Sequence, residues 1–345
     1  MTAVLILRAH GCPPQAIVAA CGLDERTVAA WLHRAGAHGQ AVHAHRVERG
    51  DLDLGQGQAD EIRVTVRGGA VWQAMVVALP SRLWLGGVVS PTRDGARVTR
   101  LLRRGGWAPA RRRRRSCCAW TGSPPTSAHH QRAVFRAPVY SGTPGRPRLR
   151  LPDGFLLAQV VKSPKGRRLA EVVRRVVVGT EEAVARAIVA TRGGTVITTV
   201  ITTVITTVIT TVIITSYIER LNAPVRAHLA PLARRGRGLA HGTALIASGL
   251  WLVGSAYNFC WTHQSLRLRA IGGRTWLERT PAMAAGLTDH VWSMEELLRY
   301  PVPPADPIAV PRPRPRRRRG RGDGVLIPFP RARTRPPHAP SGNAA

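Results

Sequence analysis

The sequence predicts an α/β fold, with a short all-α segment in front of it and a basic tail behind it. Helical periodicity and capping signals fill residues 3–35. Alternating and apolar β-branched segments, separated by Gly and Pro turns, follow over 59–104 and 155–178. Apolar helical patterns then run over 218–300. Residues 301–345 are rich in Pro, Arg and Gly and lack periodicity, which predicts a disordered basic tail.

Positive charge is the strongest compositional feature. The 345 residues include 51 Lys and Arg against 19 Asp and Glu, a formal net charge of +32. Because basic side chains neutralise phosphates, this excess favours a nucleic-acid partner, and we expect double-stranded DNA. GC-rich coding also inflates Arg, and the only lysines are Lys162 and Lys165. Codon bias therefore accounts for part of the excess.

The cysteines and the apolar segments argue against two other classes of protein. No CxxC pair or Cys/His spacing indicates a zinc site or a disulfide framework, which fits a reducing cytoplasm. No uninterrupted run of 18 apolar residues predicts a membrane span. We therefore expect a cytoplasmic, nucleoid-associated protein with no membrane partner. The cysteines are Cys12, Cys21, Cys117, Cys118 and Cys260.

Residues 1–36 are predicted to form a helix-turn-helix. A first helix covers 3–9, Pro14 opens a second over 15–20, Gly22 makes the corner, and Asp24 caps a third. The apolar residues of these helices form a small core: Ile17, Val18, Val28, Trp31 and Leu32. The outer face of the third helix is left with Arg26, Thr27, Ala30, His33 and Arg34.

A basic second helix after a Gly corner can enter the major groove of DNA. We therefore expect Arg26, Thr27, His33 and Arg34 to contact DNA. An ordinary three-helix packing unit with a solvated basic face is the alternative. Residues 37–58 are rich in Gly, His and Gln and lack periodicity, so we predict a linker there.

The next segment predicts three antiparallel strands. Residues 61–66 alternate, Gly68-Gly69 signals a hairpin, and apolar strands follow over 71–79 and 83–89. A helix is predicted from residue 91 to residue 104, and this order is how a ribonuclease-H-like domain begins. Asp60 stands at the head of the first strand, where a carboxylate can hold Mg²⁺. An ordinary turn Asp is the alternative.

Residues 105–132 fit neither helix nor strand. The five arginines at 111–115 could form a basic DNA-binding arm. The genetic code offers another interpretation. Trp is encoded only by TGG and Thr codons begin with AC, so the shifted frame across the Trp120/Thr121 junction must contain GAC, an Asp codon. The same shift gives Leu across Cys117/Cys118. The displaced frame thus encodes an apolar strand that ends in Asp, and we infer that this segment is translated out of frame.

Further strands are predicted over 155–161 and 171–178, and a helix over 181–190. Residues 195–214 repeat Thr-Val-Ile-Thr four times and then end in Thr-Val-Ile-Ile. So exact a repeat suggests replication slippage of one ancestral strand. Its β-branched residues favour strand and aggregation.

The helix that follows this repeat combines charge and apolar periodicity. Glu219, Asn222 and Arg226 share one face, and a second face is apolar. Pro224 is expected to kink or shorten this helix. A buried helix over 244–259 and a last helix over about 293–300 complete the predicted elements. The apolar face consists of Ile218, Leu221, Val225 and Leu229.

Five blocks of sequence, at 58–61, 81–91, 216–222, 251–261 and 279–288, carry a family resemblance when taken in order. The most specific are Ser-Tyr-Ile-Glu-Arg-Leu-Asn at 216–222 and the stretch from Tyr257 to Thr280. Together they resemble bacterial insertion-sequence transposases of the type named after insertion sequence one. The resemblance covers roughly residues 10–303 and implies a ribonuclease-H-like catalytic domain over 59–300, disrupted at 105–132 and by the repeats.

This resemblance implies an Asp-Asp-Glu triad that works with a two-metal site, Mg²⁺ or Mn²⁺, in DNA cleavage and strand transfer. Asp60 matches the first Asp and Glu219 the Glu, so both are expected to be catalytic and metal-binding. The second Asp is absent where Trp120-Thr121 stands, and the metal site is therefore incomplete. Asp94 and Asp153 are alternatives at less suitable places.

The partners expected from this resemblance are element ends, target DNA and further copies of the chain. Arg220, Asn222 and Arg226 are expected to contact DNA beside the helix-turn-helix residues. The expected function is that of a transposase impaired in this copy. A non-catalytic DNA-binding remnant, or a repressor of transposition, is the alternative.

Overall fold

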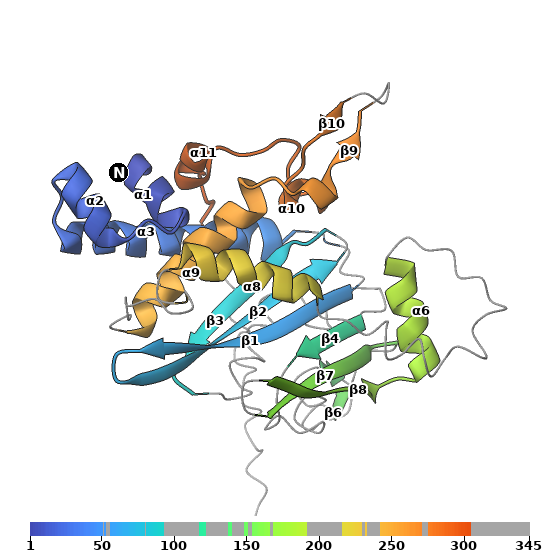
Figure 1. Ribbon diagram of the computed structural model, residues 1–345. Helices are drawn as coiled ribbons and strands as arrows, with labels where there is room; N and C mark the ends of the chain where they lie inside the picture. Colours follow the sequence, from blue (N-terminus) through green and yellow to red (C-terminus); the bar gives the residue numbers. More distant parts are fainter. Residues whose placement is uncertain are drawn as a thin grey trace, which may run out of the picture. The chain divides into compact units, whose positions relative to one another are not determined.

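The structure is a computed structural model of the chain, shown in Figure 1. Residues 1–303 form one compact unit, and residues 304–345 are separate from it. Four predictions lie wholly or largely outside the described residues: the helix up to residue 104, most of 105–132, the repeats at 195–214 and the tail. The structure describes residues 1–50, 52, 56–79, 81–92, 117–121, 137–139, 148–150, 154–165, 168–191, 216–229, 232, 242–270 and 275–304.

Three helices open the chain, as predicted. Helix α1 spans Thr2–Ala9, α2 spans Pro14–Cys21 and α3 spans Glu25–His43. The predicted cap is confirmed, because Asp24 Oδ2 accepts hydrogen bonds from the backbone N–H groups of Arg26 (3.0 Å) and Thr27 (3.3 Å). Gly22 ends α2 in the left-handed region, with φ of 62°. A small core of Val4, Ile17 and Val28 joins the three helices, with Val18 and Trp31 packed against it.

The linker predicted over 37–58 is wrong for most of its length. Helix α3 continues to His43, a π-helical turn covers Ala44–Glu48, and the first strand already starts at Gln56. Tertiary packing explains the difference. A Cβ atom on Gly36 would lie 2.5 Å from the carbonyl oxygen of Ser248, so the backbones of α3 and the later helix α9 nearly touch.

A mixed six-stranded sheet forms the centre of the chain (Figure 1). Its order is β3-β2-β1-β4-β7-β8. The predicted Gly68-Gly69 hairpin is confirmed by the antiparallel pairing of Val66 with Gly69. The α/β class is therefore confirmed. The strands are β1 (Gln56–Val66), β2 (Gly69–Leu79), β3 (Trp84–Ser90), β4 (Cys117–Thr121), β7 (Leu156–Lys165) and β8 (Arg168–Val178), and β5 (Ala137–Val139) pairs separately with β6 (Arg148–Arg150).

Two features of this sheet differ from the sequence prediction. Strand β1 begins at Gln56, so Asp60 lies inside the strand and not at its head. Residues 117–121, predicted to fit no regular element, form strand β4, which runs parallel to both β1 and β7. The first three strands are antiparallel to one another, as predicted.

Three longer helices follow the sheet strands: α6 (Glu181–Thr191), α8 (Ser216–His228) and α9 (Thr243–Phe259). The apolar face predicted for α8 is confirmed, because Ile218, Leu221 and Val225 are all buried against the sheet. The helix continues past Pro224 to His228. Helix α9 is buried along most of its length, and the side chain of Asn258 bonds both the N–H and the carbonyl of Trp84, at 2.8 Å each.

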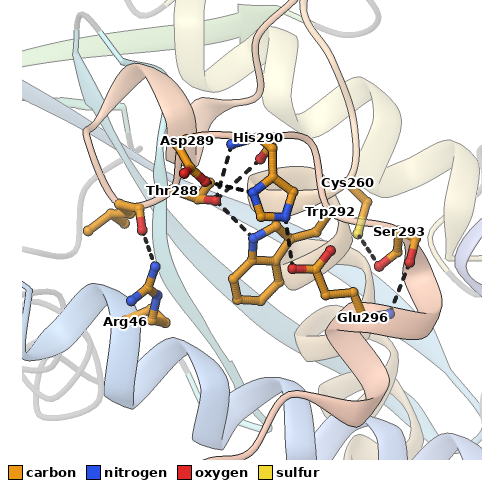
Figure 2. Close-up of polar contacts among 9 residues, drawn as sticks. Arg46, Cys260, Thr288, Asp289, His290, Trp292, Ser293 and Glu296 are labelled. Carbon is orange, nitrogen blue, oxygen red and sulfur yellow. Dashed lines mark hydrogen bonds and ion pairs between the residues drawn. The ribbon is translucent and has the colours of Figure 1, made fainter.

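The last described segment ties the N-terminal helices to α9 (Figure 2). Arg46 donates a hydrogen bond to the carbonyl of Leu287, and Trp292 Nε1 donates to Thr288 Oγ1 at 2.9 Å. The Trp292 ring stacks on Phe259 at 4.5 Å between centroids. The N-terminal helices are thus part of one packed unit. This segment contains the turn η5 (Gln264–Leu266), strands β9 (Leu268–Arg269) and β10 (Trp276–Leu277), and helices α10 (Pro281–Ala284) and α11 (Met294–Arg299).

The close contact at Gly36 gives a test of this packing. Gly36→Ala would stabilise an independent N-terminal domain by about 1 kcal/mol, because Ala is the better helix former. Packed on α9, the same change should destabilise the chain by about 1–3 kcal/mol, because the new methyl group meets the Ser248 backbone. Urea unfolding measures the difference. Ala30→Ser, at an exposed position of the same helix, is the control and should change the free energy of unfolding by less than about 0.5 kcal/mol.

A pH test follows from the His290 cluster in Figure 2. Asp289 lies 2.6 Å from Nδ1 and Glu296 lies 2.9 Å from Nε2, and these hydrogen bonds raise the pKa of His290. A raised folded-state pKa stabilises the fold fully below the ordinary value of 6.5 and loses that effect as pH rises through the raised value. We expect a small decline in stability above neutral pH.

This decline should disappear in His290→Asn. Urea midpoints of both proteins, measured from mildly acidic to mildly alkaline pH, isolate the contribution of the imidazole from that of other titrating groups. Identical pH profiles for the two proteins would contradict the assignment.

Candidate functional site

Asp60 is held in place by two hydrogen bonds. Its Oδ2 atom accepts from Asn222 Nδ2 at 2.6 Å, and its Oδ1 atom accepts from the Glu61 backbone N–H at 2.8 Å. Asn222 belongs to α8 and is 3% exposed. Asn222 therefore joins the carboxylate on β1 to helix α8.

The start of α8 is fixed to the same strand. Gln58 Oε1 accepts from the backbone N–H groups of Tyr217 and Ile218, each at 3.1 Å. These N–H groups have no partner within the helix, since the first turn of any α-helix leaves its donors unsatisfied. Gln58 is 2% exposed, so the bonds are shielded from water. Two amide side chains thus couple β1 and α8 at consecutive turns.

Along α8, Glu219 lies between the residues bonded to Gln58, which are Tyr217 and Ile218, and Asn222, which bonds Asp60. It is exposed, and it precedes Asn222 by three residues on α8. Residues three apart on a helix are neighbours on its surface, with Cβ atoms about 5–6 Å apart. Glu219 is therefore a helical neighbour of the residue that binds Asp60. The two acids that sequence analysis selected, 159 residues apart, come from elements that contact each other directly.

The register of β4 bears on where the second Asp implied by the resemblance would lie. Strand β4 pairs in parallel with β1, and Trp120 is the partner of Ala59. Continuing this register by one residue brings Thr121 level with Asp60. The Trp120/Thr121 junction, where the shifted frame encodes Asp, therefore lies on the strand beside Asp60.

The two residues predicted to bind metal, Asp60 and Glu219, are oxygen donors of the kind that a divalent cation such as Mg²⁺ prefers. Mg²⁺ in proteins is commonly held by one or two carboxylates, with water and substrate phosphates filling the other positions. Asp60 and Glu219 supply that number. Across the described ranges, the structure contains no group of three or more His, Cys, Asp or Glu side chains that could hold a metal by themselves.

Arg82 is a further residue of this region that sequence analysis did not select. It adopts a left-handed backbone conformation, with φ of 60°. Its guanidinium carbon lies 5.0 Å from the ring centroid of Tyr217, in the first turn of α8. A cation over an aromatic face is attracted to it. The sequence predicted a break between the strands at 71–79 and 83–89 but gave no reason to single out Arg82 within it.

The charge of Arg82 also acts on two rings, the buried Tyr257 and the partly buried His263. Burial and, to a smaller extent, the nearby charge of Arg82 together lower the pKa of His263 to about 4. Burial raises the pKa of Tyr257, which Arg82 partly opposes. The two rings contact each other at 4.7 Å between centroids. At neutral pH, His263 is therefore an uncharged residue.

The residues predicted to contact DNA have different surroundings. Arg26 and Arg34 are exposed on α3, and Thr27 is half-buried. His33 is exposed, but its Nδ1 lies 2.9 Å from Ser248 Oγ of α9. Arg220 is exposed and Arg226 is partly exposed on α8.

Asn222, which was also predicted to contact DNA, is 3% exposed, and its Nδ2 group donates to Asp60 inside the fold. The helical period placed it with Glu219 and Arg226, at the border of the buried face. Its partner on β1 could not be inferred from that period.

Comparisons with known proteins add no relative. No family model, no curated protein and no solved structure matches the chain. Within the part of the chain that the structure describes, no helix is both long and apolar enough to cross a membrane.

The bonds from Gln58 give a test of how the site is assembled. Gln58→Leu keeps the volume but removes the acceptor of two buried N–H groups, and we expect a loss of about 1–3 kcal/mol in the free energy of unfolding. Gln56→Leu is the matched control. Gln56 is 4% exposed and lies on the same side of the same strand. Equal losses in the two variants, measured by urea unfolding, would show that the hydrogen bonds from Gln58 to α8 add no stability beyond that of any buried Gln on this strand.

Proposed function

We propose that this chain is a DNA transposase by descent, which binds the ends of an insertion element and cleaves and joins DNA with a divalent metal. The observation that carries the proposal is the parallel register of Trp120 with Ala59. The codon argument locates a lost Asp at the Trp120/Thr121 junction without any knowledge of strand pairing. The register brings that junction beside Asp60. Two independent kinds of information thus select the same corner of the sheet.

The topology supports a ribonuclease-H-like assignment of the sheet. Strands β1, β2 and β3 are antiparallel neighbours, and β4 then lies parallel to β1 on its other side. This is the arrangement that the resemblance implies for the catalytic domain. The acids stand on β1 and on α8, which contact each other through Asn222.

The N-terminal helices support an end-binding role. Helices α2 and α3 are joined at Gly22, and the exposed face of α3 carries Arg26 and Arg34. A helix presented in this way can lie in a major groove, with basic side chains against phosphates. Arg220 and Arg226 on α8 would extend the DNA contact toward the acids.

The residues of the site have separate tasks in this proposal. Asp60 and Glu219 would hold the metal, which supplies Lewis-acid stabilisation of charge on the phosphoryl group during in-line displacement. Asn222 orients Asp60 through its bond to Oδ2. Gln58 fixes the first turn of α8 and so the position from which Glu219 extends.

A second candidate is a DNA-binding remnant without chemistry, which could repress an intact copy. The observation that favours it is the residue that follows Trp120, the partner of Ala59, on β4. It is Thr121, where the proposed triad requires a carboxylate. With one acid replaced, metal affinity should fall.

Restoring the acid separates these candidates. In a strand-transfer assay with Mg²⁺ or Mn²⁺, we expect Thr121→Asp to raise cleavage over the wild-type chain by at least about tenfold, because even outer-shell groups of metal sites contribute 10–100-fold. Trp120→Asp, one register step away, is the matched control and should give no gain. A chain with the other frame restored over 105–132 is the stronger version of the same test.

Glu219→Gln, introduced together with Thr121→Asp, should abolish the gain. DNA binding without cleavage in every variant would support the remnant. Absence of both binding and cleavage, in chains shown to be folded, would overturn the proposal.

A further inference from the structure

The β9–β10 hairpin exposes apolar side chains that proteins normally bury. Leu268 is 47% exposed, Trp276 47% and Leu277 53%. Strand pairing divides them between two faces, because Leu268 is the partner of Leu277 and Arg269 is the partner of Trp276. One face is therefore aliphatic, and the other is aromatic and basic.

The aromatic face carries two cations. The guanidinium carbons of Arg267 and Arg269 lie 4.1 Å and 5.4 Å from the ring centroid of Trp276. Neither arginine forms an ion pair with any described carboxylate. The nearest acid in sequence, Glu278, accepts a hydrogen bond from Thr262 Oγ1 at 3.0 Å. Two uncompensated cations beside an open indole ring attract a ligand that is both anionic and planar.

The hairpin stands on a fixed base. Arg279 Nε donates to the carbonyl of Leu266 at 2.8 Å, and the His263 N–H donates to the carbonyl of Arg279 at 3.0 Å. Across the hairpin, the Ala270 N–H donates to the carbonyl of Thr275 at 3.0 Å. These bonds hold the strands that present Trp276, so the ring needs little ordering when it binds a ligand.

The base of the hairpin also lies close to the candidate site. His263 contacts the Tyr257 ring, and both sense the charge of Arg82, which lies over Tyr217 in the first turn of α8. Glu219 follows two residues later. The Tyr257–His263 ring contact, the electrostatic effect of Arg82 on both rings, and the cation–π contact of Arg82 with Tyr217 therefore relate the base of the hairpin to the helix that carries Glu219.

We propose that the β9–β10 hairpin is a DNA-binding arm, in which Trp276 stacks on an unpaired base while Arg267 and Arg269 neutralise the adjoining phosphates. Aromatic rings bind single strands by stacking, since every base has a π face, and basic side chains follow the backbone. Duplex bases are already stacked on their neighbours, so the ring selects unpaired ends. This proposal rests on the proposed function only in taking DNA as the ligand.

Fluorescence anisotropy with the full chain tests the arm. The probes are a labelled blunt duplex and the same duplex with a short single-stranded extension, both in EDTA so that no cleavage occurs. Trp276→Ala should lose about 5- to 150-fold in affinity for the extended duplex, the equivalent of one base–aromatic stack. Its affinity for the blunt duplex should not change.

Two further variants make the result specific. Trp276→Phe keeps an aromatic face and should retain most of the affinity. Leu7→Ala, at an apolar position of α1 that is 40% exposed, should bind both probes as the wild type does. Because Trp276 is half exposed, Trp276→Ala should unfold at the wild-type urea concentration.

Equal losses on the two probes, or no loss on either, would overturn the proposal. A change in oligomeric state without a change in affinity would do the same, and would make the exposed hairpin a contact between copies. The measurement needs no cleavage. The DNA-binding arm can therefore be confirmed even if the chain does not cleave DNA, and it can be refuted even if the chain does.

Discussion

The candidate site depends on one contact, the bond from buried Asn222 to Asp60. An amide inside a protein must find hydrogen-bond partners, because leaving it unsatisfied costs the full desolvation of the group. The Nδ2 group of Asn222 meets this requirement on β1, and Gln58 meets the matching requirement of the first N–H groups of α8. Within the described residues, the buried Oδ1 of Asn222 has no hydrogen-bond partner. The position of Glu219 relative to Asp60 is thus set by these buried hydrogen bonds together with the apolar packing of Ile218, Leu221 and Val225 on the sheet.

Two kinds of residue lie side by side at this corner of the sheet. Asp60, Gln58 and Asn222 take part in the hydrogen bonds between β1 and α8, whereas the neighbouring strand carries Trp120 and Thr121. Strand β4 nevertheless pairs with both β1 and β7. Backbone pairing requires only an extended conformation, which Cys, Trp and Thr favour. Pairing of β4 with its neighbours therefore does not depend on which side chain occupies position 121.

Local signals predicted the local structure well. The Asp24 cap, the Gly22 corner and the Gly68-Gly69 hairpin each depend on a few neighbouring residues, and each is confirmed. The failures arose where distant residues decide. Gly36 and Gly39 are poor helix formers, but α9 requires small residues there, so α3 runs on to His43. Asn222 looked exposed because its partner lies 162 positions away in sequence.

The continuity of α3 fixes the position of the N-terminal helices relative to the sheet. A flexible linker would instead allow these helices to take many positions. A single helix of 19 residues, about 28 Å long, instead acts as a rigid spacer, and its C-terminal part packs on α9. Each residue inserted into it would turn the basic face by about 100° about the helix axis. In a protein that binds DNA through this face, the length of α3 fixes the distance between the recognised sequence and the site of cleavage.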